Sequence, residues 1–215
     1  MITAKFENAP GILLIAPVRG LVSEVPRVLS ELDAFAPARV GLGVSSDELG
    51  SLLDYFVTAD AEPIVPLTDN ETSEVRGLVR FGEVRVPNPS FVEALRWAWS
   101  RGLPTEPLDP DDERTAALFA EHIGYLELVR RTVREHRISR SPPTPSSPDE
   151  FALQWDRETA SGRGSREFAE ARDQHLVGRL PALTADRRPL AVVVDRERFD
   201  SIRSLLTQGP PSTIA

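Results

Sequence analysis

The stretch 188-RPLAVVVDRERF-199 passes from five consecutive apolar residues directly into four charged ones. A short apolar run that begins after a proline and ends at charged residues is typical of a buried β-strand. The residues that follow, 196–208, repeat apolar side chains at helical spacing. In open α/β proteins the junction between such a strand and its helix is where ligands bind. The stretch therefore predicts a buried strand at 190–194, and the charged turn after it becomes a candidate site.

The same order of elements opens the chain. "GILLIAPV" (11–18) and "ARVGLGV" (38–44) are buried-strand patterns, and an amphipathic helical pattern follows each of them. A strand that alternates with a helix favours parallel pairing, because the helix returns the chain to the same end of the sheet. We expect an α/β fold with a central, mostly parallel sheet that includes residues 12–17, 39–44 and 190–194 and has helices on both faces.

The segments between these strands predict further elements. "EPIVPL" (62–67) and "LPTEPLD" (103–109) are candidate strands. Alternating apolar residues on either side of a glycine predict an added β-hairpin at about 78–86. Apolar side chains at helical spacing predict one long amphipathic helix at about 111–138. The four prolines of "SRSPPTPSSPD" (139–149) predict an exposed loop, since proline removes a backbone donor.

Length and composition predict one domain over residues 1–215. The formal net charge is −8, which disfavours binding to nucleic acid or to anionic lipid. No apolar run approaches the roughly 20 residues that span a bilayer, and the first residues lack the pattern of a secretory signal. We expect a cytoplasmic protein without nucleic-acid or membrane partners, and the sequence leaves its oligomeric state open.

The residue types that hold metals and nucleotides are sparse. There is no cysteine, so thiolate metal sites and cysteine nucleophiles are excluded. His122 and His136 are fourteen residues apart, about 21 Å along one helix, and His175 lies far from both. No glycine-rich phosphate loop follows a predicted strand, and there is no nucleophile elbow of the GxSxG type. We therefore expect neither a metal nor a cofactor.

Two arginines follow the first and the last predicted strands. A parallel sheet would bring Arg19 and Arg198 to the same carboxyl edge, where α/β sheets bind ligands. A cation in the first turn of a helix, as at Arg198, opposes the helix dipole, and a bound anion would offset that cost. We expect Arg19 and Arg198 to converge on one anion-accepting cleft; the alternative is that both extend into water. Asp195 is expected to cap the final helix.

Two more groups of charged residues are candidate ligand contacts. Arg172 and His175 lie three residues apart on a predicted helix, so they share a face and can converge on an anion beside Asp173. The alternative is a solvated surface with an exposed ion pair. Asp109 opens an acidic run where a strand passes into a helix, which suits a carboxylate site. The alternative here is that the run caps the helix and complements its dipole.

The order of these elements, from "LLIAPVR" (13–19) to "PLAVVVDRERFDSIRSLL" (189–206), resembles the TraB/PrgY family, which is related to the TIKI metalloproteases. In that family the first and last strands each lead into a GxxH motif, the second strand carries a glutamate, and a helix with an Arg-Asp pair precedes the last strand. The resemblance covers residues 12–206 and rests on pattern more than on identity.

Carried over to this chain, the resemblance places Ala16–Arg19 and Asp195–Arg198 at the two GxxH motifs. Neither glycine nor histidine is present in either, and Gly43 or Val44 stands where the glutamate is expected. Arg172 and Asp173 match the Arg-Asp pair, and Asp109 matches an acidic position after the middle strand. Arginine stays protonated and is neither a general base nor a metal ligand. The resemblance therefore implies that metal-assisted hydrolysis is lost.

Three functions remain open at this point. The first is a non-catalytic TraB-like protein with a binding or regulatory role, whose ligand or partner, a small anion or a protein, is unknown. The second is a hydrolase of the same fold with a reassigned site built on Arg19, Arg198, Arg172, Asp173 and His175. The third is an unrelated α/β interaction module in which all of these residues are structural.

Overall fold

The computed structural model describes residues 1–6, 11–58, 68–140 and 143–208. Within these ranges, five strands form one sheet in the order β1-β2-β5-β3-β4. β1 pairs with β2 in antiparallel fashion, and the other neighbours are parallel. The strands are β1 (Ile2–Lys5), β2 (Ile12–Ala16), β3 (Arg39–Leu42), β4 (Thr105–Pro107) and β5 (Leu190–Val193). The expected α/β fold with a mostly parallel sheet is confirmed.

The first and last predicted strands are direct neighbours. Ile12 of β2 lies opposite Leu190 of β5, and Leu42 of β3 lies opposite Val193 on the other side. β5 is therefore the centre of the sheet, and all of its side chains are buried. This position explains its continuous apolar sequence, because a strand that is covered on both faces has no polar side.

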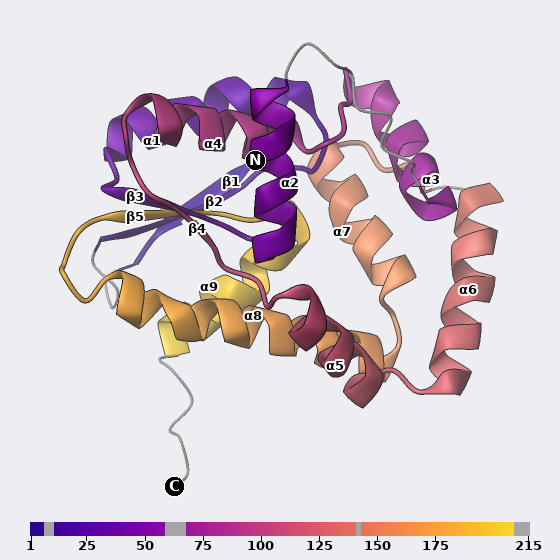
Figure 1. Cartoon of the computed structure of the whole chain (residues 1–215). Helices are drawn as coiled ribbons and strands as arrows, with labels where there is room; N and C mark the ends of the chain where they lie inside the picture. The colour runs from indigo at the N-terminus through magenta and orange to yellow at the C-terminus, as the bar shows by residue number, and fades with distance from the viewer. Residues whose placement is uncertain (7–10, 59–67, 141–142, 209–215) are drawn as a thin grey trace, which may run out of the picture.

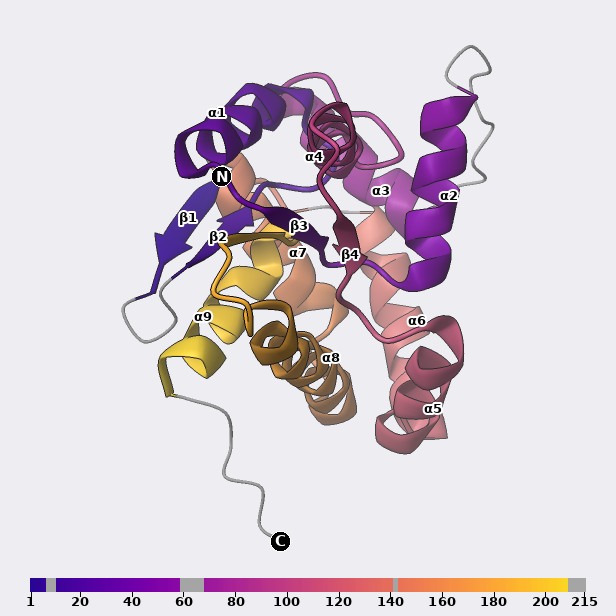
Figure 2. The same cartoon turned by 60° about the vertical axis from the view of Figure 1, so that its left-hand side comes forward.

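Helices cover both faces of the sheet (Figure 2). α1 (Val25–Phe35), α2 (Ser46–Val57) and α4 (Pro89–Ser100) enclose one apolar cluster with the sheet, and α8 (Arg163–Leu183) and α9 (Phe199–Gln208) enclose another. None of the helices in the described ranges is long and apolar enough to cross a membrane.

A second group of helices lies beside the sheet (Figure 1). It consists of α3 (Asp69–Leu78), α5 (Asp112–His122), α6 (Tyr125–Arg140) and α7 (Pro148–Thr159). A third apolar cluster joins α3, α6 and α7 to the segment after β2: the ring of Phe151 stacks on Trp155 and packs with Leu78, Ile138 and Val18. These helices therefore lie against the chain that leaves the carboxyl end of β2.

The prediction of a single long helix at 111–138 is wrong, because the structure divides this stretch into α5 and α6. Ile123 adopts an extended conformation and is buried, and Gly124, a poor helix former, follows it. α5 packs on α8, whereas α6 packs on α3 and α7. The break lets the two halves bury their apolar sides against different partners.

The prediction of a β-hairpin at 78–86 is also wrong. Val79–Phe81 form a 3₁₀ turn, and Val84 makes an antiparallel bridge with Leu21. The amide of Val22 donates to the carbonyl of Glu83, and the amide of Arg85 donates to Gly20. The second half of the expected hairpin thus pairs with the chain that leaves β2 instead of with its own neighbour.

Two other expectations have mixed outcomes. The strand expected at 103–109 is confirmed as β4, and the one expected at 62–67 lies outside the described residues. The prediction of an exposed loop at 139–149 is wrong in part, because α6 extends to Arg140 and α7 begins at Pro148. Pro143, between these helices, is buried, and its carbonyl accepts a hydrogen bond from Arg80. Residues 141–142 lie outside the described ranges.

The start of α8 is held by a side chain from α6. The N-cap residue of α8, Gly162, supplies no side-chain hydrogen bond. The Glu127 carboxylate instead accepts from the amides of Gly164 (3.0 Å) and Ser165 (2.6 Å) and from the Ser165 hydroxyl (2.8 Å). Hydrogen bonds from the Ser165 amide and hydroxyl lower the pKa of Glu127. Gly164 also allows close packing, since a Cβ there would lie 2.0 Å from the backbone oxygen of His122.

We expect Gly164→Ala to lower the free energy of unfolding by about 1–3 kcal/mol, because the new methyl group would overlap the backbone at the end of α5. Urea denaturation measures the change. Gly178→Ala on the same helix is the matched control, because a Cβ there meets nothing within 4 Å. That substitution should stabilise the protein by up to about 1 kcal/mol through helix propensity. Equal effects at the two positions would contradict the close packing of α5 on α8.

Candidate functional site

The turn after β5 brings a buried carboxylate to the carboxyl edge of the sheet. Asp195 is 4% exposed, and the guanidinium of Arg19 donates to its Oδ2 from Nη2 (2.6 Å) and Nε (3.1 Å). Asn88 Nδ2 donates to Oδ1 at 3.1 Å. The negative charge of Asp195 raises the pKa of Arg19 above its ordinary value. The expected cap is wrong: Asp195 makes no side-chain cap hydrogen bond, because its two oxygens accept from Arg19 and Asn88.

Arg198 makes a second, more deeply buried network. Its Nε donates to Asp173 Oδ1 at 2.8 Å, and its Nη1 donates to Asp109 Oδ2 at 2.9 Å. Arg172 also donates to Asp109 Oδ2. Gly43 makes room for the guanidinium, since a Cβ at Gly43 would lie 3.1 Å from Arg198 Nη1. One carboxylate after β4 thus binds arginines from α8 and from the turn before α9.

The protonation of Asp109 is set by these partners. The Asp109 side chain is only 2% exposed, and burial alone would raise its pKa. The guanidinium groups of Arg198 and Arg172 outweigh burial, so the pKa of Asp109 is lowered. Asp109 is therefore a buried carboxylate that stays ionised between two cations, and neither arginine carries an uncompensated charge at this point.

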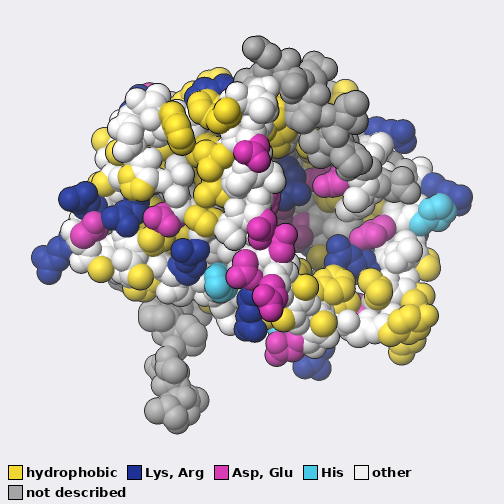
Figure 3. All heavy atoms as spheres, in the orientation of Figure 1, with side chains coloured by type: hydrophobic (Ala, Val, Ile, Leu, Met, Phe, Trp, Pro, Cys, Tyr) yellow, Lys and Arg dark blue, Asp and Glu magenta, His cyan; other side chains and the backbone are white. Residues whose placement is uncertain are grey.

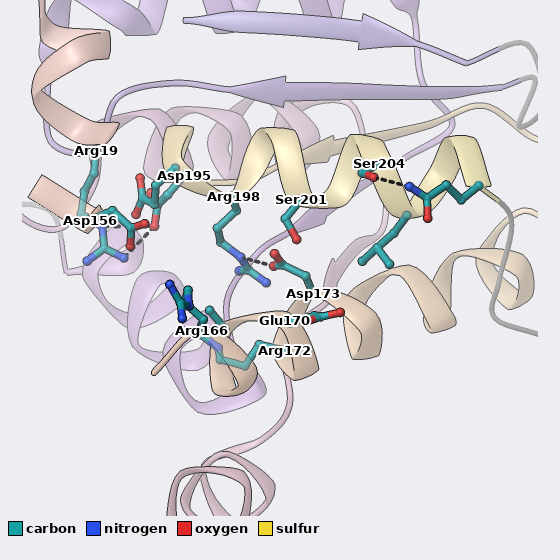
Figure 4. A pocket seen from close by; sticks show the side chains of 14 residues that line it. Arg19, Asp156, Arg166, Glu170, Arg172, Asp173, Asp195, Arg198, Ser201 and Ser204 are labelled. Carbon is teal, nitrogen blue, oxygen red and sulfur yellow. Dashed lines mark hydrogen bonds and ion pairs between the residues drawn. The ribbon is translucent and has the colours of Figure 1, made fainter. Parts of the chain in front are cut away.

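A cavity of about 570 Å³ opens between α8 and α9 at this edge of the sheet (Figure 4). Charged side chains of both signs line it, and they come from four segments of the chain. The basic ones are Arg19, Arg166, Arg172 and Arg198, and the acidic ones are Asp156, Glu170, Asp173, Asp195 and Glu197. The cavity is therefore a polar site with balanced charge, not a uniformly positive cleft.

Two donors on the cavity wall lack an acceptor. Arg172 Nε is buried and has no hydrogen-bond partner. The side chain of Arg166, on the same helix, makes no hydrogen bond or ion pair with any residue in the described ranges. Figure 4 shows both side chains on α8, among the residues that line the cavity. A buried N–H without a partner costs free energy, which an acceptor atom on a ligand would recover.

Glu197 lies in the same cavity with an unusual protonation state. Burial raises its pKa to about 8, and the negative charge of Asp195 adds to the effect. Burial and the nearby Asp173 also raise the pKa of Asp156. Glu197 therefore carries a proton at neutral pH and can donate a hydrogen bond. Acidic side chains also gather on the surface over α2 and α5 (Figure 3).

The structure brings together five of the six residues that the sequence analysis selects. Arg19, Arg172, Asp173 and Arg198 line the cavity, and Asp109 lies behind two of them. His175 is not among the lining residues; burial and the neighbouring Arg179 lower its pKa. The expected convergence of Arg172 and His175 on one anion therefore does not occur in this cavity.

The sequence analysis missed Arg166, Glu197 and Asp156. For Arg166 a signal was present, because residues 166, 169, 170 and 173 repeat at helical spacing and so share one face of α8. Glu197 lies inside the quoted charged turn, but only its burial beside Asp195 distinguishes it from a solvated acid.

No family model matches the chain, and no match to a curated protein was found. Within the described ranges, no three acidic or histidine side chains are grouped so that they could hold a metal ion.

We expect Asp109→Asn to lower the free energy of unfolding by about 3 kcal/mol, because it leaves two arginines beside a neutral group in a buried setting. Urea denaturation at neutral pH measures the loss. Asp186→Asn is the control: Asp186 is 42% exposed and pairs with Arg39, so its loss should cost less than about 1 kcal/mol. A loss at Asp109 no larger than at Asp186 would show that the network does not stabilise the fold.

We expect Glu197 to make the protein less stable as pH rises. The folded protein holds the Glu197 proton up to a pKa of about 8, against an ordinary value of 4.5. Between these values the unfolded chain has released a proton that the folded chain retains, so the free energy of unfolding falls with increasing pH. Glu197→Gln should flatten that slope in urea denaturation between about pH 5 and pH 8.

Glu121→Gln, at an exposed glutamate of α5, is the matched control for this pH series and should keep the wild-type slope. Identical slopes in wild type and Glu197→Gln would mean that Glu197 does not titrate with a raised pKa.

Proposed function

We propose that the protein is a non-catalytic, TraB-like α/β binding protein whose cavity at the carboxyl edge of the sheet takes a small ligand with an anionic group. The observation that carries the proposal is the buried Arg172 Nε–H on the cavity wall, which has no acceptor. Arg166, without a partner in the described ranges, and the half-exposed Arg19 supply further positive charge to the same space. A carboxylate or phosphate oxygen would accept from these donors.

The internal ion pairs restrict how such a ligand binds. Arg198 Nε and Nη1 donate to Asp173, Asp109 and the Gly43 carbonyl, and Nη2 forms an ion pair with Asp109 Oδ1 at 2.8 Å. Arg198 is in this proposal a positioning residue that orders the cavity wall. The ligand contacts fall to Arg166, Arg172 and the outer side of Arg19. The protonated Glu197 would add a hydrogen bond to an anionic oxygen without repelling it.

The position of the two arginines supports the TraB-like correspondence. The resemblance assigns Arg19 and Arg198 to the two histidine positions, and both line the same cavity at the ends of adjacent parallel strands. Arginine stays protonated, so it does not take part in the histidine chemistry that the resemblance implies for the family. This supports a binding role for the cavity.

One observation favours a second candidate, a hydrolase with a reassigned site. Glu197 and Asp195 are acids in one cavity with different surroundings, and such pairs separate into a proton donor and an ionised partner. In this candidate Glu197 gives its proton to a leaving group. Turnover that Glu197→Gln abolishes, with ligand binding retained, would replace the binding role by this one.

The test of the binding role is an NMR titration of the protein with inorganic phosphate and with succinate, followed at the amides of 195–198. Arg172→Lys should weaken binding about tenfold or more, since lysine keeps the charge beside Asp109 but lacks the Nε–H. Arg101→Lys, at an arginine that pairs with Asp33 on the other face of the sheet, is the control. Unchanged affinity in Arg172→Lys, or no saturable shift in the wild type, would refute the proposal.

A further inference from the structure

A separate cavity of about 470 Å³ lies between α3 and α6, away from the carboxyl edge of the sheet. The two helices pack side by side at the periphery of the molecule (Figure 1). Arg76 of α3 and Arg140 of α6 line this cavity, and neither side chain makes a hydrogen bond or ion pair with any residue in the described ranges. Two exposed cations therefore face one hollow without an internal counter-charge.

The described residues around the cavity add little negative charge. Among those that line it, Glu135 is the one acid, and Arg131 Nε donates to its Oε1 at 2.8 Å. α6 itself carries five arginines against two glutamates. This is a locally basic surface on a chain whose formal net charge is −8. A local excess of positive charge attracts an anion to this cavity, although the protein as a whole is negatively charged.

Polar groups that line the same cavity would complete the coordination of an anion. The Thr72 hydroxyl lines the cavity and has no side-chain partner in the described ranges. Asn70 Oδ1 is buried there without a hydrogen bond, which costs free energy until a donor reaches it. The wall therefore offers two guanidinium groups and a hydroxyl to an anion, and one amide oxygen to a neighbouring donor.

We propose that the cavity between α3 and α6 binds a phosphate ester that carries a hydroxyl group beside the phosphate. Arg76 and Arg140 bind the phosphate oxygens from two different helices, which suits a tetrahedral group better than a planar carboxylate. The Thr72 hydroxyl donates to a third oxygen. The ester's own hydroxyl donates to Asn70 Oδ1 and satisfies the buried acceptor. This site does not depend on the cavity between α8 and α9.

Such a phosphate ester can be a molecule in solution or the headgroup of a lipid. Apolar side chains of α6 are exposed on the helix that carries Arg140, among them Tyr125 at 79%, Leu126 at 69% and Val133 at 66%. Val133 and Arg140 are seven residues apart and so share a face. Hydrophobic side chains gather on the surface where α5 and α6 meet (Figure 3). Binding of a soluble phosphate ester and binding of a lipid headgroup are therefore measured in two separate experiments.

The first experiment is an NMR titration with glycerol 3-phosphate and inorganic phosphate, followed at the amides of 70–76 and 132–138. The Arg172→Lys background suppresses the first cavity. We expect Arg76→Ala and Arg140→Ala each to weaken binding about tenfold or more, and glycerol 3-phosphate to bind more tightly than inorganic phosphate. Arg163→Ala is the control, because Arg163 pairs only with Glu167 on the surface of α8. Thermal unfolding verifies that each variant is folded.

The second experiment measures sedimentation with vesicles of phosphatidylglycerol and, for comparison, of phosphatidylcholine. Binding in either experiment that Arg76→Ala and Arg140→Ala abolish, and Arg163→Ala leaves intact, supports the site and identifies its source as solution or membrane. Absence of saturable binding in both experiments overturns the proposal. Binding that persists in both arginine variants overturns it as well, because the contact would then lie elsewhere.

Discussion

The carboxylate of Asp109 is the contact on which the structure of the carboxyl edge of the sheet depends. It follows β4, and the arginines that it binds come from α8 and from the turn between β5 and α9. Three segments that meet only through tertiary structure are thereby joined at the point where the parallel strands end. Two charges of one sign around a buried charge of the other are costly to desolvate, and the ion pairs of Asp109 with Arg172 and Arg198 offset that cost.

That arrangement decides what kind of site the cavity can be. A row of arginines without internal partners would bind anions strongly but with little selectivity. Here Asp195, Asp109 and Asp173 neutralise Arg19, Arg172 and Arg198, and the remaining unsatisfied groups are few and directional. Selectivity in such a site comes from matching individual donors, because a ligand that fails to reach Arg172 Nε leaves a buried donor unpaired.

The sequence predicts the parts of the fold in which burial is continuous. Residues 190–194 are apolar without interruption because β5 is covered on both faces, so the pattern is unambiguous. β1 was missed because Ile2–Lys5 form a half-exposed edge strand with no clear alternation. The break between α5 and α6 was missed because the helical spacing of apolar residues continues across Gly124, and only the tertiary partners differ. The convergence of Arg19 and Arg198 follows from parallel topology, whereas their partners, Asp195 and Asp109, lie 176 and 89 residues away in the chain.

The cap that α6 provides for α8 has a mechanical consequence. Glu127 accepts three hydrogen bonds from the first turn of α8, and Arg166 lies in that same turn. A displacement of α6 must therefore carry the beginning of α8 with it or break those three bonds. α6 lines one of the two cavities and α8 lines the other, so the contact of Glu127 links an element of each. The hydrogen bonds from Ser165 and Gly164 lower the pKa of Glu127, so its carboxylate is ionised near neutrality and retains these acceptor contacts.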